Sequence, residues 1–241
     1  MQCLILAGGL ATRLRPITEN IPKGMLLVNG KPFIEYQIEL LKKHDVREII
    51  LCIGHKGEMI EDYFNDGSKW GVNIRYSKEI NLLGTGGAIR NALDLLNKNF
   101  IVLYGDAYLD VNYRKIIKYA TRINLHALLA VYKNEGKFDV SNVKFLDKEF
   151  VFYDKNNPGR DMRYIDYGMS ILSKKVIEKY IPDGEIFDLA DCYHQLSVNK
   201  ELVGYEVNER FYEIGSFAGL EEFKNFIELK QVSKIYKNNF S

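Results

Sequence analysis

The chain is predicted to form an α/β fold around a doubly wound, mostly parallel sheet. Three short apolar runs have the composition of strands buried on both faces, and each runs into glycine: residues 3–7, 48–54 and 100–104. Stretches with helical periodicity separate these runs. This alternation of strand and helix is typical of right-handed crossovers, which place helices on both faces of a sheet.

The other elements of the first half follow the same alternation. Residues 32–43 are expected to form a helix because Phe33, Tyr36 and Leu40 recur at helical spacing between charged residues. Residues 59–64 and 87–96 are two further predicted helices, and residues 73–77 alternate between apolar and polar like a strand.

The second half is less regular and has more antiparallel features. The expected elements are strands over 126–132, 167–172, 202–207 and 210–214, a hairpin over 140–152, a polar loop over 153–161, and helices over 174–180, 187–196 and 218–230. No linker or repeat divides the chain. We predict one domain over residues 1–230, with halves 1–125 and 126–230, a small antiparallel cap in the second half, and a C-terminal tail over 231–241 that frays or mediates contacts.

The composition argues against a general affinity for polyanions. Lys and Arg total 33 and Asp and Glu total 32, which gives a formal net charge of +1. Any phosphate binding must therefore come from a local site, and neither nucleic acid nor a membrane surface is an expected partner. Cys3, Cys52 and Cys192 lack metal-ligand spacing and are expected as buried thiols. With no signal peptide or membrane span in the pattern, we expect a cytoplasmic protein.

A glycine-rich turn follows the first predicted strand. Adjacent Gly8 and Gly9 let the backbone bend sharply, and consecutive free N–H groups can then hold phosphate oxygens. Arg13 can add a bidentate contact to a phosphate, and Lys23 adds a compact positive charge. The turn matches neither the ATPase phosphate loop nor the dinucleotide fingerprint. The two glycines alone would also suit a simple tight turn, whereas Arg13 and Lys23 favour a phosphate site.

Asp106 comes directly after the buried run over residues 100–104. Ligands of open α/β sheets bind at the carboxyl ends of the strands, and a carboxylate there can hold a hard divalent cation. Gly105-Asp106 on its own is a common turn. Together with the glycine-rich turn, it makes Asp106 a candidate metal ligand.

These residues resemble the signature of the sugar-1-phosphate nucleotidylyltransferases, or NDP-sugar pyrophosphorylases. The resemblance is carried by residues 6–14, 22–23, 28–36, 83–89 and 105–106, and it is strong to Asp110 and weak afterwards. The Gly-Thr-Gly-Gly-Ala-Ile stretch over residues 84–89 and the short chain are most similar to the heptose-1-phosphate guanylyltransferases. The resemblance implies a Rossmann-like, GT-A-like fold with a nucleotide-binding half followed by a sugar-binding half.

The resemblance also implies which residues contact the nucleotide. They belong to the entry signature and to the start of the predicted helix near residue 87: Leu6, Ala7, Gly8, Gly9, Thr12, Gly84, Thr85 and Gly86. Small residues at the helix start permit close approach of a base or ribose, and exposed N–H groups there can read base edges. A plain helix entry is the alternative at this position.

The resemblance implies a second metal ligand at Glu213. Relatives usually present an Asp before Ile-Gly near the end of the chain, and Glu213 holds that place with one more methylene. Mg²⁺ is therefore expected between Asp106 and Glu213. Two further departures are Gly24, where relatives often have proline, and the Phe-Asp-Val stretch over residues 138–140, which in relatives faces the sugar.

Three residues are expected on the sugar side. Gly168 resembles a glycine step that lines the sugar pocket in relatives, and Lys155 resembles a lysine that contacts the sugar phosphate. Asp166 would accept hydrogen bonds from sugar hydroxyls, although a solvated strand end would look the same in sequence.

The implied activity couples a nucleoside triphosphate to a sugar 1-phosphate and releases pyrophosphate, for surface glycan synthesis. GTP and a heptose or mannose-like phosphate are the leading substrates. Arg13, Lys23 and Asp106 are the predicted catalytic residues, since the reaction depends on positioning and charge neutralisation. Cytidylyl or uridylyl transfer to another sugar or to a non-sugar phosphate stays open. So does a catalytically silent subunit that senses nucleotide sugars, and relatives are often homo-oligomers.

Overall fold

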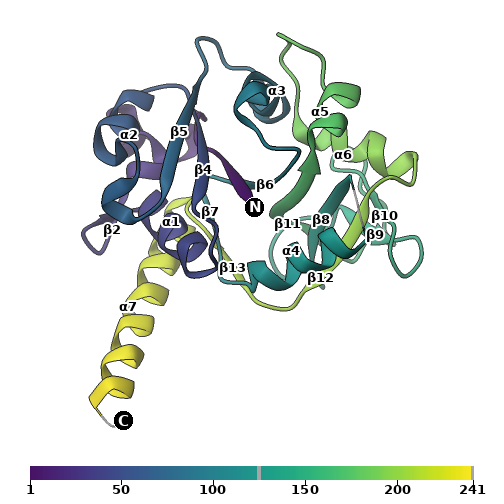
Figure 1. The fold of residues 1–241 in the computed structure, drawn as a ribbon. Helices are drawn as coiled ribbons and strands as arrows, with labels where there is room; N and C mark the ends of the chain where they lie inside the picture. The colour runs from purple at the N-terminus through teal and green to yellow at the C-terminus, as the bar shows by residue number, and fades with distance from the viewer. Residues whose placement is uncertain (124–125, 240–241) are drawn as a thin grey trace.

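A nine-stranded sheet runs through the middle of the molecule (Figure 1). The computed structural model describes residues 1–123 and 126–239, with side chains up to residue 232. The main path of the sheet has the order β10-β9-β11-β6-β1-β4-β5, and β8 and β12 extend it beside β11. The bounds are β1 Gln2–Leu6, β4 Glu48–Ile53, β5 Asn73–Lys78, β6 Asn99–Tyr104, β8 Ala127–Lys133, β9 Val143–Phe145, β10 Val151–Tyr153, β11 Tyr164–Ser173 and β12 Val203–Val207.

The pairing confirms the predicted α/β sheet and its antiparallel part. β6, β1, β4 and β5 are parallel to one another, and β12 is parallel to β8. β11 runs antiparallel to β6, β8 and β9, and β9 and β10 form the expected hairpin. Two smaller sheets pair β2 Leu27–Val28 with β3 Lys31–Pro32, and β7 Ala107–Leu109 with β13 Phe211–Glu213.

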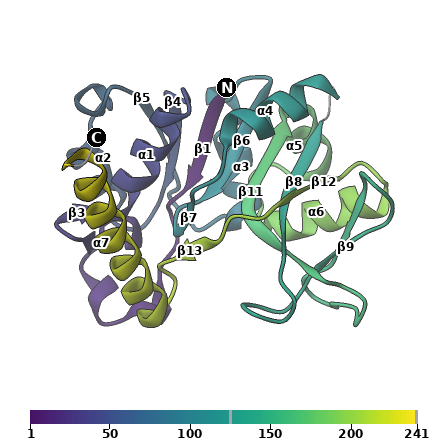
Figure 2. The same ribbon diagram turned by 90° about the horizontal axis from the view of Figure 1, so that it is seen from below.

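Helices cover both faces of the sheet, which explains why its central strands are apolar throughout. One face packs against α1 Phe33–Lys43, α2 Gly57–Phe64, α4 Tyr113–Arg122 and α7 Phe217–Asn239; the other packs against α3 Gly84–Asn91, α5 Lys174–Tyr180 and α6 Leu189–Val198. Successive side chains of β1 alternate between the two cores, with Cys3 and Ile5 in the first and Leu4 in the second. Figure 2 shows α1 and α7 side by side on one side of the molecule.

Two predicted helices have other bounds in the structure, and one helix was missed. α3 begins at Gly84 and ends at Asn91, so a 3-10 turn over Leu93–Leu95 replaces the last part of the helix expected over 87–96. α4 was not predicted at all. α7 continues to Asn239, past the expected end at residue 230, because no glycine or proline after Gly219 stops it. The tail expected over 231–241 is therefore helical to Asn239, and residues 240–241 lie outside the described residues.

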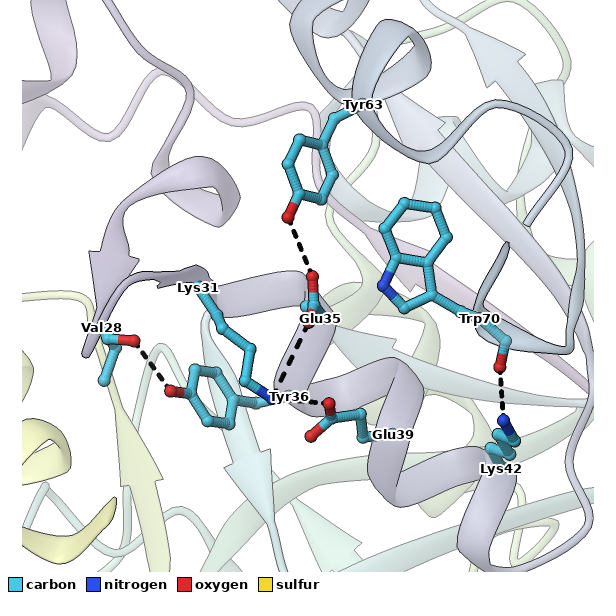
Figure 3. Close-up of polar contacts among 8 residues, drawn as sticks. All are labelled: Val28, Lys31, Glu35, Tyr36, Glu39, Lys42, Tyr63 and Trp70. Carbon is cyan, nitrogen blue, oxygen red and sulfur yellow. Dashed lines mark hydrogen bonds and ion pairs between the residues drawn. The ribbon is translucent and has the colours of Figure 1, made fainter. Parts of the chain in front are cut away.

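Polar contacts hold α1 against α2 and against the 3-10 turn Ser68–Trp70 (Figure 3). The Tyr63 hydroxyl in α2 donates a hydrogen bond to Glu35 Oε2 over 3.0 Å, and Lys42 Nζ donates one to the Trp70 carbonyl over 2.7 Å. Glu35 is buried, so its carboxylate needs such a partner. These contacts fix the position of the helix that packs beneath β7 and the end of β6.

The three cysteines are buried, as the sequence predicts. Cys3, Cys52 and Cys192 are free and buried, and burial raises the pKa of each thiol. Among the helices that the structure describes, none has the length and apolarity needed to cross a membrane.

Candidate active site

Two neighbouring clefts lie at the carboxyl ends of β1 and β6. The smaller has a volume of about 230 Å³ and the larger about 820 Å³, and Tyr104 and Asp106 line both. The predicted residues in the smaller cleft are Leu6, Ala7, Gly8, Gly9, Lys23, Gly84, Thr85 and Asp106. Those in the larger cleft are Arg13, Asp106, Lys155, Asp166, Gly168 and Glu213. Asp106 thus stands where the two groups of predicted residues meet.

An ion pair joins two of the predicted catalytic residues. Lys23 Nζ lies 2.7 Å from Asp106 Oδ2, and both side chains are largely covered, with 20% and 25% of their surface exposed. Asp106 sits in the turn after β6, where the Gly105 N–H donates to the Leu6 carbonyl over 2.9 Å. The backbone bond ties this turn to the end of β1, and so brings Asp106 next to the glycine-rich entry turn.

Glu213 reaches the same place from the far end of the chain. β13 pairs with β7 so that Glu213 stands opposite Ala107, and the Ile214 N–H donates to the Asp106 carbonyl over 2.9 Å. Burial and the negative charge of Asp106 raise the pKa of Glu213, while Arg13 and Lys23 act in the opposite direction. The two predicted metal ligands and the two predicted cations therefore share one electrostatic environment.

Gly8 packs against a carboxylate that the sequence reasoning missed. A Cβ atom at Gly8 would lie 2.8 Å from Glu79 Oε1, so a larger residue would push this carboxylate away. Glu79 lines the smaller cleft, its Oε2 accepts a hydrogen bond from the Leu83 N–H over 3.1 Å, and burial raises its pKa. A signal was present in the sequence, because Glu79 directly follows a parallel strand and so lies at the binding edge of the sheet.

The start of α3 docks against the segment before α6. The N–H groups of Gly86 and Gly87 both donate to the Phe187 carbonyl, over 2.8 and 3.1 Å. Thr85 Oγ1 donates to Asp188 Oδ1 over 2.7 Å. The expectation of exposed N–H groups here is therefore wrong for Gly86, which is buried and outside both clefts. The helix start needs small residues because the backbone of residues 185–188 packs directly against it.

Thr12 and Arg13 lie in a short 3-10 turn, Thr12–Leu14, and both are exposed. Arg13 lines the larger cleft, and its Nη2 would lie 3.0 Å from a Cβ atom at Gly215, close to Glu213. Thr12 lines neither cleft. Its contact with a nucleotide stays a prediction.

The predicted sugar-side residues gather in the larger cleft. The Gly168 N–H donates to Asp166 Oδ1 over 2.8 Å, and Gly168 has a φ of +90°, which favours glycine. Burial raises the pKa of Asp166 to about 6, with the Gly168 N–H and Lys155 opposing this effect. Lys155 Nζ also lies 3.3 Å from Asp188 Oδ2.

The larger cleft has further walls that were only partly foreseen. Phe138, Asp139 and Val140, which depart from the pattern of relatives, do line it. Arg210 lines it too, with its guanidinium 5.2 Å from the Phe138 ring centre. The sequence pattern indicates only a strand at Arg210.

Comparison with known proteins places the chain in a family. The model of the nucleotidyl transferase family matches residues 2–148. A D-glycero-alpha-D-manno-heptose 1-phosphate guanylyltransferase from Campylobacter jejuni is 34% identical over 181 residues, which cover 75% of this chain and 79% of the relative. A UTP--glucose-1-phosphate uridylyltransferase from Synechocystis is 32% identical over 88% of this chain, which spans 58% of that longer protein.

A solved structure agrees with these relatives. HddC from Yersinia pseudotuberculosis complexed with GMP-PN superposes with a TM-score of 0.74 and 28% sequence identity, covering 94% of this chain and 99% of the other. Family, relatives and fold agree with two adjoining clefts that gather cationic and carboxylate side chains. The chain belongs to the nucleotidyl transferase family, and it is a sugar-1-phosphate nucleotidyltransferase.

Proposed function

We propose that this enzyme transfers GMP from GTP to a heptose or mannose-like 1-phosphate, releasing pyrophosphate. We assign guanine as the base on one observation, which is that the carboxylate of Glu79 lines the smaller cleft. The names of a heptose 1-phosphate guanylyltransferase from Campylobacter jejuni and of a mannose-1-phosphate guanyltransferase from Yarrowia lipolytica support the choice of sugar. The product would be an activated sugar donor, which we place in surface glycan synthesis.

The chemistry of Glu79 favours guanine over the other bases. An ionised carboxylate only accepts hydrogen bonds, and it can take two parallel donors at once. Guanine offers two adjacent donors, N1–H and the 2-amino group, on one edge. Uracil offers a single N–H between two carbonyl oxygens, which a carboxylate would repel. Because the Gly8 backbone lies directly against Glu79 Oε1, a base at Gly8 would meet this carboxylate.

The phosphates would lie between the entry turn and Asp106. An oxygen of the sugar phosphate attacks the α-phosphorus of GTP in line, and the bond from that phosphorus to the β-phosphate oxygen breaks, so pyrophosphate leaves with the electron pair. A phosphate monoester is already nucleophilic, so no general base is needed. Lys23 would neutralise the reacting phosphates and Arg13 the departing pyrophosphate, while the amides of Gly8 and Gly9 support the triphosphate.

The carboxylates of Asp106 and Glu213 fit a hard divalent cation. Burial, and after it the negative charge of Asp106, raises the pKa of Glu213, and oxygen ligands are those that Mg²⁺ prefers. No group of three or more candidate metal ligands occurs in the described part of the chain, so substrate oxygens would complete the set. Bound there, Mg²⁺ would offset the negative charge of the phosphates.

A substrate panel tests the proposal. Purified enzyme is given each of GTP, UTP, CTP, ATP and dTTP with heptose, mannose and glucose 1-phosphates, and pyrophosphate release is measured. GTP should give the highest kcat/KM, and Asp106→Ala serves as the control for contaminating activity. A clear preference for UTP or CTP would overturn the assignment of the base.

A matched variant tests the role of Glu79. Glu79→Gln keeps an oxygen for the Leu83 N–H but replaces one acceptor with a donor. We expect its kcat/KM for GTP to fall roughly 10- to 100-fold, the usual range for a bidentate base contact, with a smaller change for the other nucleotides. An unchanged preference for GTP would show that Glu79 does not read the base.

A further inference from the structure

A buried glutamine holds the turn that carries Asp106. Gln37 lies in the middle of α1 and is only 3% exposed. Its Nε2 donates to the Tyr104 carbonyl over 2.9 Å and to the Ala107 carbonyl over 2.7 Å. These two carbonyls flank Gly105 and Asp106, so one side-chain amide spans both sides of the turn.

The orientation of this amide is fixed by its surroundings. If the amide were turned over, Oε1 would face two carbonyl oxygens, and no hydrogen bond could form. In the observed orientation Oε1 is buried and has no hydrogen-bond partner among the described residues. An unsatisfied buried acceptor costs stability, and the two donated hydrogen bonds offset that cost. An apolar residue here would leave the Tyr104 and Ala107 carbonyls without this donor, so the polar side chain at this position serves the turn.

Gln37 reaches both carboxylates of the site through the backbone. Ala107, whose carbonyl it holds, pairs with Glu213 across β7 and β13, and the Asp106 carbonyl accepts from Ile214. The helix that presents Gln37 is itself held by the Glu35–Tyr63 and Lys42–Trp70 hydrogen bonds (Figure 3). α1 thus presents Gln37 to the turn that carries Asp106.

We propose that Gln37 is a positioning residue, which fixes Asp106, and with it Glu213, at the reacting phosphates. The proposal rests on the proposed function for its kinetic consequence, but its structural part does not. Gln37 touches no substrate in this scheme and acts only through the backbone of residues 104–107. Among the described residues, its amide donates to the Tyr104 and Ala107 carbonyls and makes no direct hydrogen bond to the glycine-rich turn.

Gln2 provides a matched control. It is also a buried glutamine, 1% exposed, and it also bridges two backbone groups, accepting from the Asn97 N–H over 2.8 Å and donating to the Leu95 carbonyl over 3.1 Å. It lies at the start of β1, at the end opposite the clefts. Gln2→Met and Gln37→Met therefore remove equivalent bonds from two places, and only one of these places adjoins the site.

The experiment compares the two variants by kinetics and by hydrogen exchange. Gln37→Met should lower kcat about 10- to 100-fold, as expected when a catalytic group is displaced by about 1 Å, and should raise the Mg²⁺ concentration needed for half-maximal rate. The KM for GTP should change little. Amide exchange in the peptide covering residues 104–109 should speed up in Gln37→Met but not in Gln2→Met, whose kcat should match the wild type.

The proposal is overturned by a kcat for Gln37→Met equal to that of Gln2→Met, or by unchanged exchange over residues 104–109. Gln37→Glu is a second variant, in which a carboxylate replaces the donor with an acceptor. It should be more impaired than Gln37→Met, and the reverse order would also contradict the proposal. The proposed function would fail if the wild type did not release pyrophosphate with any of the tested pairs of nucleotide and sugar 1-phosphate. The exchange data would still decide whether Gln37 holds the turn.

Discussion

Asp166 combines burial with a position in the larger cleft, and this makes it a pH-sensitive residue. Burial raises its pKa to about 6, so the carboxylate loses its charge as the pH falls through that value. Only the ionised form accepts hydrogen bonds with both oxygens. Sugar binding that depends on Asp166 should therefore weaken below pH 6.

We predict that the KM for the sugar 1-phosphate rises several-fold, up to about 10-fold, between pH 7 and pH 5, as expected for a group that is about one tenth ionised one unit below its pKa. Asp166→Asn should remove this part of the pH dependence. The sugar phosphate itself titrates near pH 6, but it does so equally with both enzymes. The difference between the two KM profiles thus reports Asp166, and parallel profiles would exclude it from sugar binding.

The same shift has a consequence for stability with a definite sign. The pKa of Asp166 is higher in the folded chain than its ordinary value of 3.8, so the folded state binds the proton more tightly. The contribution of this group to stability is full below pH 3.8 and is lost as the pH rises through about 6.

At the residue scale, the sequence could predict the charged residues better than the contacts that orient them. Arg13, Lys23 and Asp106 stood out in the sequence because they belong to motifs that resemble a family signature, and their catalytic roles stay predictions. Glu79 was overlooked because a single acidic residue after a strand looks like a solvated surface. Gln37 was hidden inside a regular helical pattern, where only its partners reveal what it does.

At the scale of elements, the loop after β8 is held in shape by one buried amide. Asn134 is fully buried, its Oδ1 accepts from the Phe138 N–H over 3.0 Å, and its Nδ2 donates to the Asp139 carbonyl and to Ser141 Oγ. Phe138 and Asp139 line the larger cleft. The amide therefore sets the shape of one wall of the larger cleft.

We predict that Asn134→Ala raises the KM for the sugar 1-phosphate and leaves the KM for GTP unchanged. It should also lower the free energy of unfolding by about 1–3 kcal/mol, because buried polar groups lose their partner. Ser141→Ala is the milder control, since it removes one of these bonds. Steady-state kinetics with each substrate varied in turn provide the test. Equal effects on both KM values would contradict the prediction that Asn134 shapes the binding of the sugar 1-phosphate alone.

The elements also show where prediction from sequence stopped. The pattern for α4 was present, with Tyr113, Ile116 and Ala120 buried at helical spacing and Asn112 capping the helix, so this helix was predictable. The pairing of β7 with β13 was not. Each strand has three residues and the partners lie far apart in the chain, so no local pattern can indicate which strand joins which.

At the scale of the whole molecule, an aromatic cluster joins the two ends of the chain. Phe223 of α7 is fully buried, and its ring centre lies 5.0 Å from those of Phe33 and Tyr108. It therefore packs against both α1 and β7, the two elements that support Asp106. The end of the chain stabilises a site formed mainly by its beginning.

We predict that Phe223→Ala lowers the free energy of unfolding by about 3–5 kcal/mol, the usual cost of removing a buried aromatic ring. Leu229→Ala, in the same helix but 70% exposed, should cost far less. Denaturant unfolding of both variants measures the difference. Similar losses for the two would mean that α7 does not cover the core as described.

The division of the chain into a nucleotide-binding and a sugar-binding half stays a prediction. The two halves do not form separate clefts, because residues of the first half also line the larger cleft. The smaller cleft is lined by residues 6–106 alone, whereas the larger one draws on Arg13, Tyr104 and Asp106 as well as on residues 137–222. Sequence order cannot reveal this sharing, because it arises when β13 returns beside β7.

The common wall formed by Tyr104 and Asp106 has a consequence for turnover. A nucleoside diphosphate sugar would straddle that wall, with its base on one side and its sugar on the other, whereas each substrate alone occupies a single side. The product then dissociates only when its base and its sugar are both released at the same time. While one end stays bound, the other can rebind, so the product would dissociate more slowly than a ligand held in one cleft alone.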